Sequence, residues 1–258
     1  MSGSPSLFLA YSLNNSHPVC PEAFTPVPFV YQVAPSGQLL RGGQEALPTG
    51  SVLMIGGDTP PSSAGMDWFC RQVLSECHAQ QAVGVMANWV CSIAGQQTAQ
   101  RLEPILSRNQ LSFWVPESFA QAVPTAQILL SSQLSGGTLR RRLQEALAQY
   151  GNRITLAIEC TPWDFSLPCA DGQGTALTLP TMRELFTQHR CRAWFSSEFC
   201  CAYFTYQQEE QIHLVLYDNA ASVQAMLELA AELNLSGTLL FWDEIQSFHP
   251  PVWRTEQA

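Results

Sequence analysis

Eight short apolar segments, each bounded by turn-forming residues, recur along this 258-residue chain and limit its fold more than any other feature. Their residues are almost continuously apolar and do not alternate with polar ones, which is typical of strands covered on both faces. The segments are Ser6–Tyr11, Pro28–Val33, Ser51–Ile55, Ala82–Ala87, Leu111–Val115, Gln127–Ser131, Ile154–Ile158 and Thr238–Trp242. We therefore expect eight buried β-strands.

Segments with helical periodicity lie between several of these strands. Their apolar residues repeat every three or four positions in Phe69–Cys77, Leu139–Tyr150, Met182–His189 and Val223–Ala230. Alternating strands and helices favour a parallel sheet, and eight strands in one domain of this size favour a closed barrel. The predicted fold class is α/β, a reduced (β/α)8 TIM barrel, and residues 1–258 form a single domain.

Two departures from a regular barrel are expected. Ser16–Pro28 and Ala34–Gly50 are rich in Pro, Gly and Ser and lack helical periodicity, so at least two outer helices should be shortened or missing. Between the seventh and eighth strands, Tyr203–Tyr206 and Ile212–Tyr217 flank a polar turn, which predicts a small inserted β-hairpin.

Charge and cysteine usage exclude several classes of function. All twelve basic residues are arginine, and 21 acidic residues give a net charge of −9, so nucleic acid is not an expected partner. The one basic cluster, Arg140–Arg142, would be spread around a helix and form no single docking face. Nine cysteines show no metal-ligand spacing, so neither a metal site nor a cofactor is predicted.

No apolar run is long enough to span a membrane, and no basic residue precedes the short apolar run at the N-terminus. We therefore expect neither membrane association nor a signal peptide.

Several segments of the C-terminal half together resemble glycoside hydrolase family 18, the chitinase-like barrel. They are Ile154–Phe165 (ITLAIECTPWDF), Ala202–Tyr206 (AYFTY), His213–Ser222 (HLVLYDNAAS) and Leu235–Glu244 (LSGTLLFWDE). The resemblance is closest to the bacterial branch that lyses spore cortex and peptidoglycan, and it covers roughly residues 84–244. It implies a glycan containing N-acetylglucosamine, of the chitin or peptidoglycan type, as the partner. With no signal peptide visible, it implies a cytoplasmic or spore-associated location.

The same resemblance implies that the family's reaction has been lost. Family members carry Asp-x-x-Asp-x-Asp-x-Glu at the end of the fourth strand, where the glutamate protonates the glycosidic oxygen. The corresponding positions here are Val83, Met86, Asn88 and Val90, none of which ionises. The family's Met-x-Tyr-Asp at the sixth strand aligns with Leu130–Gln133 and is also missing. The leading hypothesis is therefore a catalytically inactive barrel that binds glycan or acts structurally.

Aromatic residues at predicted strand ends are the candidate ligand-binding residues. Trp242 matches the tryptophan that forms the floor of the family's sugar site, and a tryptophan face suits a pyranose ring. The further candidates are Trp163, Trp89, Trp114 and Tyr31.

Two alternatives stay open. In the first, the protein is an active glycoside hydrolase that uses relocated carboxylates, with Glu117, Glu159 and Asp164 as the candidates and Asp243 and Glu244 following the last strand. In the second, the barrel is an interaction scaffold whose mouth is filled by side chains.

Overall fold

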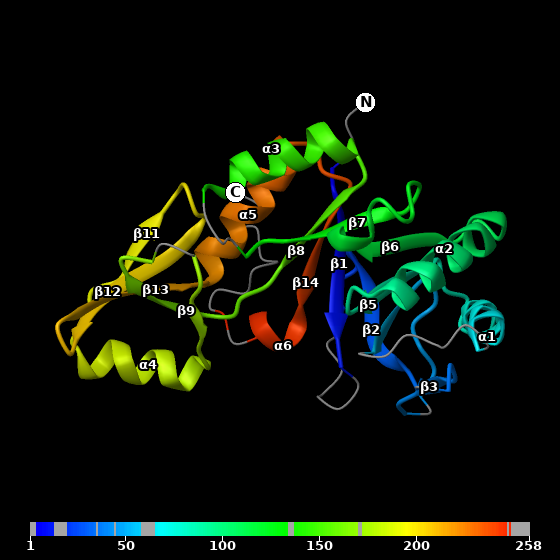
Figure 1. Ribbon diagram of the computed structural model, residues 1–258, viewed down its shortest axis with the longest axis horizontal. Helices are drawn as coiled ribbons and strands as arrows, with labels where there is room; N and C mark the ends of the chain where they lie inside the picture. The colour runs from blue at the N-terminus through cyan, green and yellow to red at the C-terminus, as the bar shows by residue number, and fades with distance from the viewer. Residues whose placement is uncertain are drawn as a thin grey trace.

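The computed structural model describes residues 4–12, 20–34, 36–43, 45–57, 65–133, 137–169, 172–246 and 248. The described residues form a barrel and a smaller sheet that lies to one side of it (Figure 1).

Eight parallel strands close the barrel, as the sequence predicts. In barrel order they are β1 (Ser6–Tyr11), β2 (Phe24–Val33), β4 (Val52–Gly57), β5 (Gly84–Trp89), β6 (Ser112–Pro116), β7 (Gln127–Ser131), β8 (Ile154–Ile158) and β14 (Gly237–Phe241). The pairing of β14 with β1 closes the ring, and β1 also pairs with β2. A short strand, β3 (Leu39–Arg41), adds antiparallel to β2. The predicted (β/α)8 class is confirmed.

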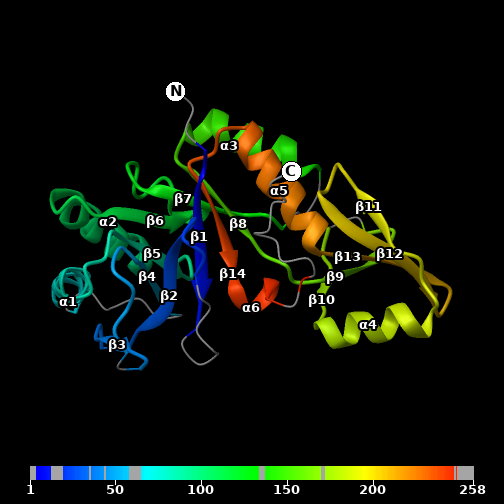
Figure 2. The ribbon, with the colours of Figure 1, turned by 180° about the vertical axis from the view of Figure 1, so that it is seen from behind.

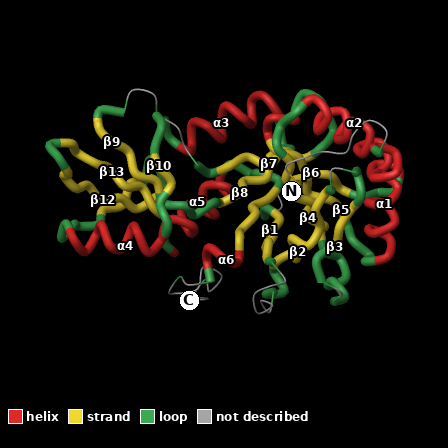
Figure 3. Tube along the Cα trace, turned by 60° about the horizontal axis from the view of Figure 1, so that its bottom comes forward, coloured by secondary structure: helices red, strands yellow, loops and turns green. Residues whose placement is uncertain are grey.

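The helices outside the ring are fewer than a regular barrel would carry, as predicted. Figure 3 shows α1 (Met66–Ala79), α2 (Ile93–Arg108) and α3 (Leu139–Tyr150) outside the strands, and α5 (Ala220–Glu232) precedes the last strand. Between β6 and β7 the chain forms only the 3-10 turn η1 (Glu117–Phe119). The described residues that join β1 to β2 and β2 to β4 contain no helix. A short helix, α6 (Trp242–Ile245), follows β14.

Between β8 and α5 the chain forms a second sheet. Its elements are β9 (Trp163–Leu167), β10 (Thr175–Ala176), α4 (Leu179–Gln188), β11 (Trp194–Ser196), β12 (Cys201–Gln208) and β13 (Gln211–Tyr217). The strands are antiparallel in the order β10-β9-β13-β12-β11, and β12 and β13 correspond to the two strands expected as a hairpin. The insertion is therefore larger than the sequence suggests.

The insertion has its own small core and meets the barrel through α5. Met182 of α4 packs with Phe204, Tyr206 and Val215 of the sheet. Seen from behind, α5 lies between the barrel and this sheet (Figure 2). Helix α5 begins at a capping box in which Asn219 and Ser222 bond each other's backbone and side chain. The helix thus fixes the chain where it returns from the insertion.

Side chains fill the barrel interior in the usual layered way. The buried interior residues are Phe8, Ala10, Val27, Val52, Met54, Met86, Trp114, Ala157 and Leu239. Residues of the opposite strand parity, such as Val85 and Ala87, pack outward against the helices. The alternation shows which strand residues point toward the mouth of the barrel.

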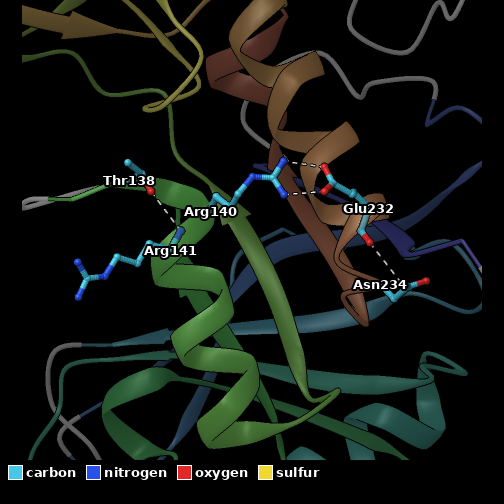
Figure 4. Close-up of polar contacts among 5 residues, drawn as sticks. All are labelled: Thr138, Arg140, Arg141, Glu232 and Asn234. Carbon is cyan, nitrogen blue, oxygen red and sulfur yellow. Dashed lines mark hydrogen bonds and ion pairs between the residues drawn. The ribbon is translucent and has the colours of Figure 1, made fainter.

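The three consecutive arginines of α3 contact three different acids. Arg140 forms a bidentate pair with Glu232 of α5, at 2.6 and 2.7 Å (Figure 4). Arg141 pairs with Glu145 on its own helix, and Arg142 pairs with Glu117 after β6. The prediction that this cluster is spread around the helix is confirmed. None of the described helices is long and apolar enough to cross a membrane.

Candidate functional site

Strand β5 is the fourth strand of the barrel and carries the positions that align with the family's acidic motif. Met86 is fully buried among the interior residues, so Asn88 and Val90 follow it on the side that leads to the barrel mouth. Asn88 is exposed, and Val90 is 57 % exposed. Val83, which precedes the strand, is also exposed. The end of the fourth strand therefore presents an amide and an apolar side chain, and no carboxylate of its own.

A cavity of about 310 Å³ lies beside the mouth, where the barrel meets the inserted sheet. Ser132 and Glu159 follow β7 and β8 on the barrel side, and Trp163, Tyr217 and Asp218 come from the ends of β9 and β13. The remaining lining residues are Gln133, Arg142, Thr161, Phe165, Gly172, Gln173, Gly174, Phe199, Cys201, Leu216 and Met226. The volume is at the small end for ligand pockets, which suits one sugar ring.

Two carboxylates of this cavity are perturbed by burial. Burial raises the pKa of Glu159, and a hydrogen bond from Ser131 opposes the rise. Burial also raises the pKa of Asp218 to about 7; hydrogen bonding by Ser222 lowers it, and the nearby charge of Glu244 raises it. Because the charged form is disfavoured in each case, both groups hold a proton at a higher pH than an ordinary carboxyl does.

Glu244, in α6, adjoins this pair. Its Oε2 accepts a hydrogen bond of 2.7 Å from the backbone N–H of Cys160. Burial raises the pKa of Glu244, the hydrogen bond from Cys160 lowers it, and the charges of Glu159 and Asp243 raise it further. Glu159, Asp218 and Glu244 thus form one electrostatically coupled group, which we call the acid group.

The structure brings one of the five predicted aromatic residues to the cavity. Trp163 lines it. Trp242 lies at the end of the eighth barrel strand, where the sequence predicts it, and is partly buried against the cluster of α3, α5 and β8. It is not among the residues that line this cavity.

The other three aromatic candidates lie in the core. Trp89 packs edge-on between Phe69 and Phe119, on the helix side of the barrel. Trp114 lies inside the barrel, where its Nε1 donates to Thr155 Oγ1 at 3.2 Å. Tyr31 is buried against α1, and its hydroxyl donates to Glu76 at 2.8 Å. The structure does not gather these three residues around Trp163.

Of the three alternative carboxylates, only Glu159 lines the cavity. Glu117 accepts a hydrogen bond of 2.8 Å from Arg142 and lines a different surface pocket, together with Gln96 and Tyr150. Asp164 lies within the inserted sheet, where Tyr206 donates to it at 2.7 Å and His213 Nδ1 lies 3.1 Å from both of its oxygens. Neither Glu117 nor Asp164 is among the residues that line the cavity, although Arg142, the partner of Glu117, does line it.

Sequence reasoning did not single out Asp218 as a candidate. It belongs to the Tyr217–Asp218 pair within the segment that resembles the family, between the end of β13 and the N-cap of α5. An acid at a strand end immediately before a helix cap is a usable signal, because such a position is fixed by the backbone on both sides. No group of three or more His, Cys, Asp or Glu in the described residues could hold a metal ion.

The sequence matches no family model and no curated protein. The structure, however, is similar to solved structures of chitinases and spore cortex-lytic enzymes. The spore cortex-lytic enzyme SleL of Bacillus megaterium is 16 % identical, with a TM-score of 0.63 over 93 % of this chain and 70 % of that one. A class V chitinase of Pseudomonas fluorescens is 14 % identical, with a TM-score of 0.64 over 96 % and 97 % of the two chains. A class V chitinase of Nicotiana tobaccum in complex with NAG4 is 12 % identical, with a TM-score of 0.60 over 91 % and 92 %. The expected chitinase-like barrel is confirmed as the fold.

Proposed function

We propose that this protein binds a glycan containing N-acetylglucosamine at the mouth of the barrel and does not hydrolyse it. Its structural neighbours are chitinases and cortex-lytic enzymes, and one of them is in complex with NAG4. In parallel barrels the ligand site lies at the carboxyl ends of the strands, which is where Trp242, Trp163 and the cavity lie. An aromatic face beside polar side chains suits a sugar ring.

The proposal that the protein does not hydrolyse the glycan rests on which residues of β5 point into the barrel. Met86 is an interior residue of the fourth strand, and Asn88 and Val90 follow it with the same parity. The resemblance aligns Val90 with the family's proton donor, and a valine side chain has no proton to give. General acid catalysis contributes about 10²–10⁴ in rate, so a barrel without it should leave the glycosidic bond intact.

The test measures binding and cleavage on the same sample. We expect calorimetry to detect binding of N-acetylglucosamine oligomers, and we expect no release of new reducing ends on long incubation. Trp242→Ala should weaken binding at least tenfold, because we place its indole under a sugar ring at the barrel mouth, next to the cavity, and buried aromatic contacts contribute much of the affinity of a site. Cleavage at an enzyme-like rate would refute the proposal, and so would a failure to bind any N-acetylated oligomer.

A second candidate function is hydrolysis by relocated carboxylates. It is favoured by one observation: Glu159 and Asp218 line the same cavity, and burial raises the pKa of each, as a general acid at neutral pH requires. This candidate requires measurable cleavage that Glu159→Gln or Asp218→Asn abolishes. Glu145, changed to Gln, is the matched control, because it pairs with the exposed Arg141 and lies outside the cavity. Cleavage that survives both cavity variants would eliminate this candidate.

A further inference from the structure

The acid group has no cation to balance it among the described residues. The ion pairs of the described chain include none of Glu159, Asp218 and Glu244. Arg142 also lines the cavity; its Nη2 donates to Glu117 at 2.8 Å, and its buried Nε donates to no atom of the described chain. The walls of the cavity are therefore electronegative, and buried charges of one sign are costly unless something pairs with them.

Three polar atoms of the cavity residues are buried without a hydrogen-bond partner in the described chain. Oδ1 of Asp218 is an acceptor, whereas Nε1 of Trp163 and Nε of Arg142 are donors. A buried polar atom that lacks a partner costs free energy, so buried polar groups are paired in most proteins. Together these atoms indicate a ligand that offers a donor to Asp218 and acceptors to Trp163 and Arg142.

The shape and lining of the cavity limit the kind of cation. A metal ion does not fit, because no cluster of three or more His, Cys, Asp or Glu in the described chain could hold one. The cavity is large enough for a single sugar ring, and Trp163, Phe165 and Tyr217 provide aromatic walls. Aromatic faces accept the apolar face of a pyranose and also attract an ammonium group.

We infer that the cavity between the barrel and the inserted sheet binds the primary ammonium group of a hexosamine unit, held between Asp218 and Glu159. This inference rests on the proposed glycan-binding function and narrows it, because it assigns this cavity to a unit that lacks its N-acetyl group. An ammonium carries three donors, which suit two carboxylates and one neutral acceptor. An acetamido group carries one donor and no charge, so it cannot balance the acid group.

A bound ammonium group would also allow the buried carboxyl of Asp218 to ionise. A cation within hydrogen-bond distance favours the ionised form and lowers the pKa of the carboxyl that burial has raised. Hydrogen bonds between charged groups are shorter and about twice as strong as neutral ones. The site should therefore discriminate strongly between an amine and its acetylated form.

The experiment compares two tetrasaccharides on the full chain by calorimetry at about pH 7. One is the β-1,4-linked tetramer of glucosamine, and the other is its fully N-acetylated counterpart. We expect the free amine to bind at least tenfold more tightly, which is about 1.4 kcal/mol. Asp218→Asn should remove this difference, and Glu159→Gln should reduce it. Glu145→Gln, which removes an exposed carboxylate of α3, is the matched control and should leave it unchanged.

The outcomes separate this inference from the proposed function. Binding of the acetylated tetramer without any gain for the amine would overturn the inference and leave the proposed function standing. Equal loss of amine binding in Glu145→Gln would show an effect of overall negative charge and would also overturn the inference. Failure of both tetramers to bind would overturn both. If Asp218→Asn does not fold, Glu159→Gln is the deciding variant. A preference for the amine that Glu159→Gln leaves unchanged would refute the site.

Discussion

Replacing Asp218 with asparagine should make the protein more stable than the wild type at alkaline pH and leave the two nearly equal at acidic pH. Burial raises the pKa of Asp218 from 3.8 to about 7. Between these two values the folded protein holds a proton that the unfolded chain has lost. Stability therefore falls as the pH rises through this window, and the loss is complete above about pH 7. Asparagine has nearly the same shape and never ionises, so its variant escapes this loss.

The size of the effect follows from the pKa. Each unit of pKa difference corresponds to about 1.4 kcal/mol, so the full effect is about 4 kcal/mol. About 3 kcal/mol of this falls between pH 5 and pH 8, where both proteins can be unfolded in urea and compared. Both proteins retain Glu159 and Glu244, whose pKa values burial also raises, so the difference between the proteins reports the charge of Asp218 together with its interaction with Glu244.

The measurement is the free energy of unfolding from urea titrations at about pH 5, 6, 7 and 8, followed by circular dichroism. The expected result is a difference between the variant and the wild type that grows steadily in favour of the variant as the pH rises. Glu145→Gln should show no such trend. A difference that is the same at every pH would mean that Asp218 is an ordinary solvated carboxyl, and the electrostatic account of the cavity would be wrong.

Three further predictions test other parts of the structure. Trp114→Ala should lower the free energy of unfolding by about 3–5 kcal/mol in urea titrations, because it leaves a cavity inside the barrel. A loss below about 1 kcal/mol would contradict the interior placement of Trp114. Asp164→Asn should cost about 1–3 kcal/mol by weakening the contacts with Tyr206 and His213, and it should leave sugar binding unchanged in calorimetry. Trp163→Ala should weaken oligosaccharide binding at least tenfold while the fold persists in circular dichroism; unchanged affinity would remove Trp163 from the site.

The barrel could be predicted from the sequence because its strands are buried on both faces. Strand β8, for example, is buried at every residue and therefore appears as an unbroken apolar run. The inserted sheet was only partly predictable for the same physical reason. Strands β10 and β11 are two and three residues long and largely exposed, so they leave no apolar run to detect. The longer strands β12 and β13 contain apolar residues that the sequence shows, and these predict only a hairpin.

The candidate site was harder to predict, because a position at or near a strand end does not say which way a side chain points. Trp89 and Trp114 both lie in barrel strands, yet one faces the helices and the other faces the interior. Alternation along each strand decides this, and it depends on a register that an apolar run does not reveal. Asp218 depends on the insertion, whose larger sheet the sequence did not predict, so its nearness to Glu159 was not predictable.

The case against the family's reaction depends on the same alternation along β5. If the strand were shifted by one residue, Trp89 would face the mouth, and Asn88 and Val90 would be buried against the helices. The observed exposures are the reverse, because Trp89 is 5 % exposed and Val90 is 57 % exposed. The pairing agrees, since Met86 lies opposite Trp114 on β6 and both are interior residues. Only the unshifted register satisfies both observations, so Asn88 and Val90 follow Met86 on the inward-facing side of the fourth strand.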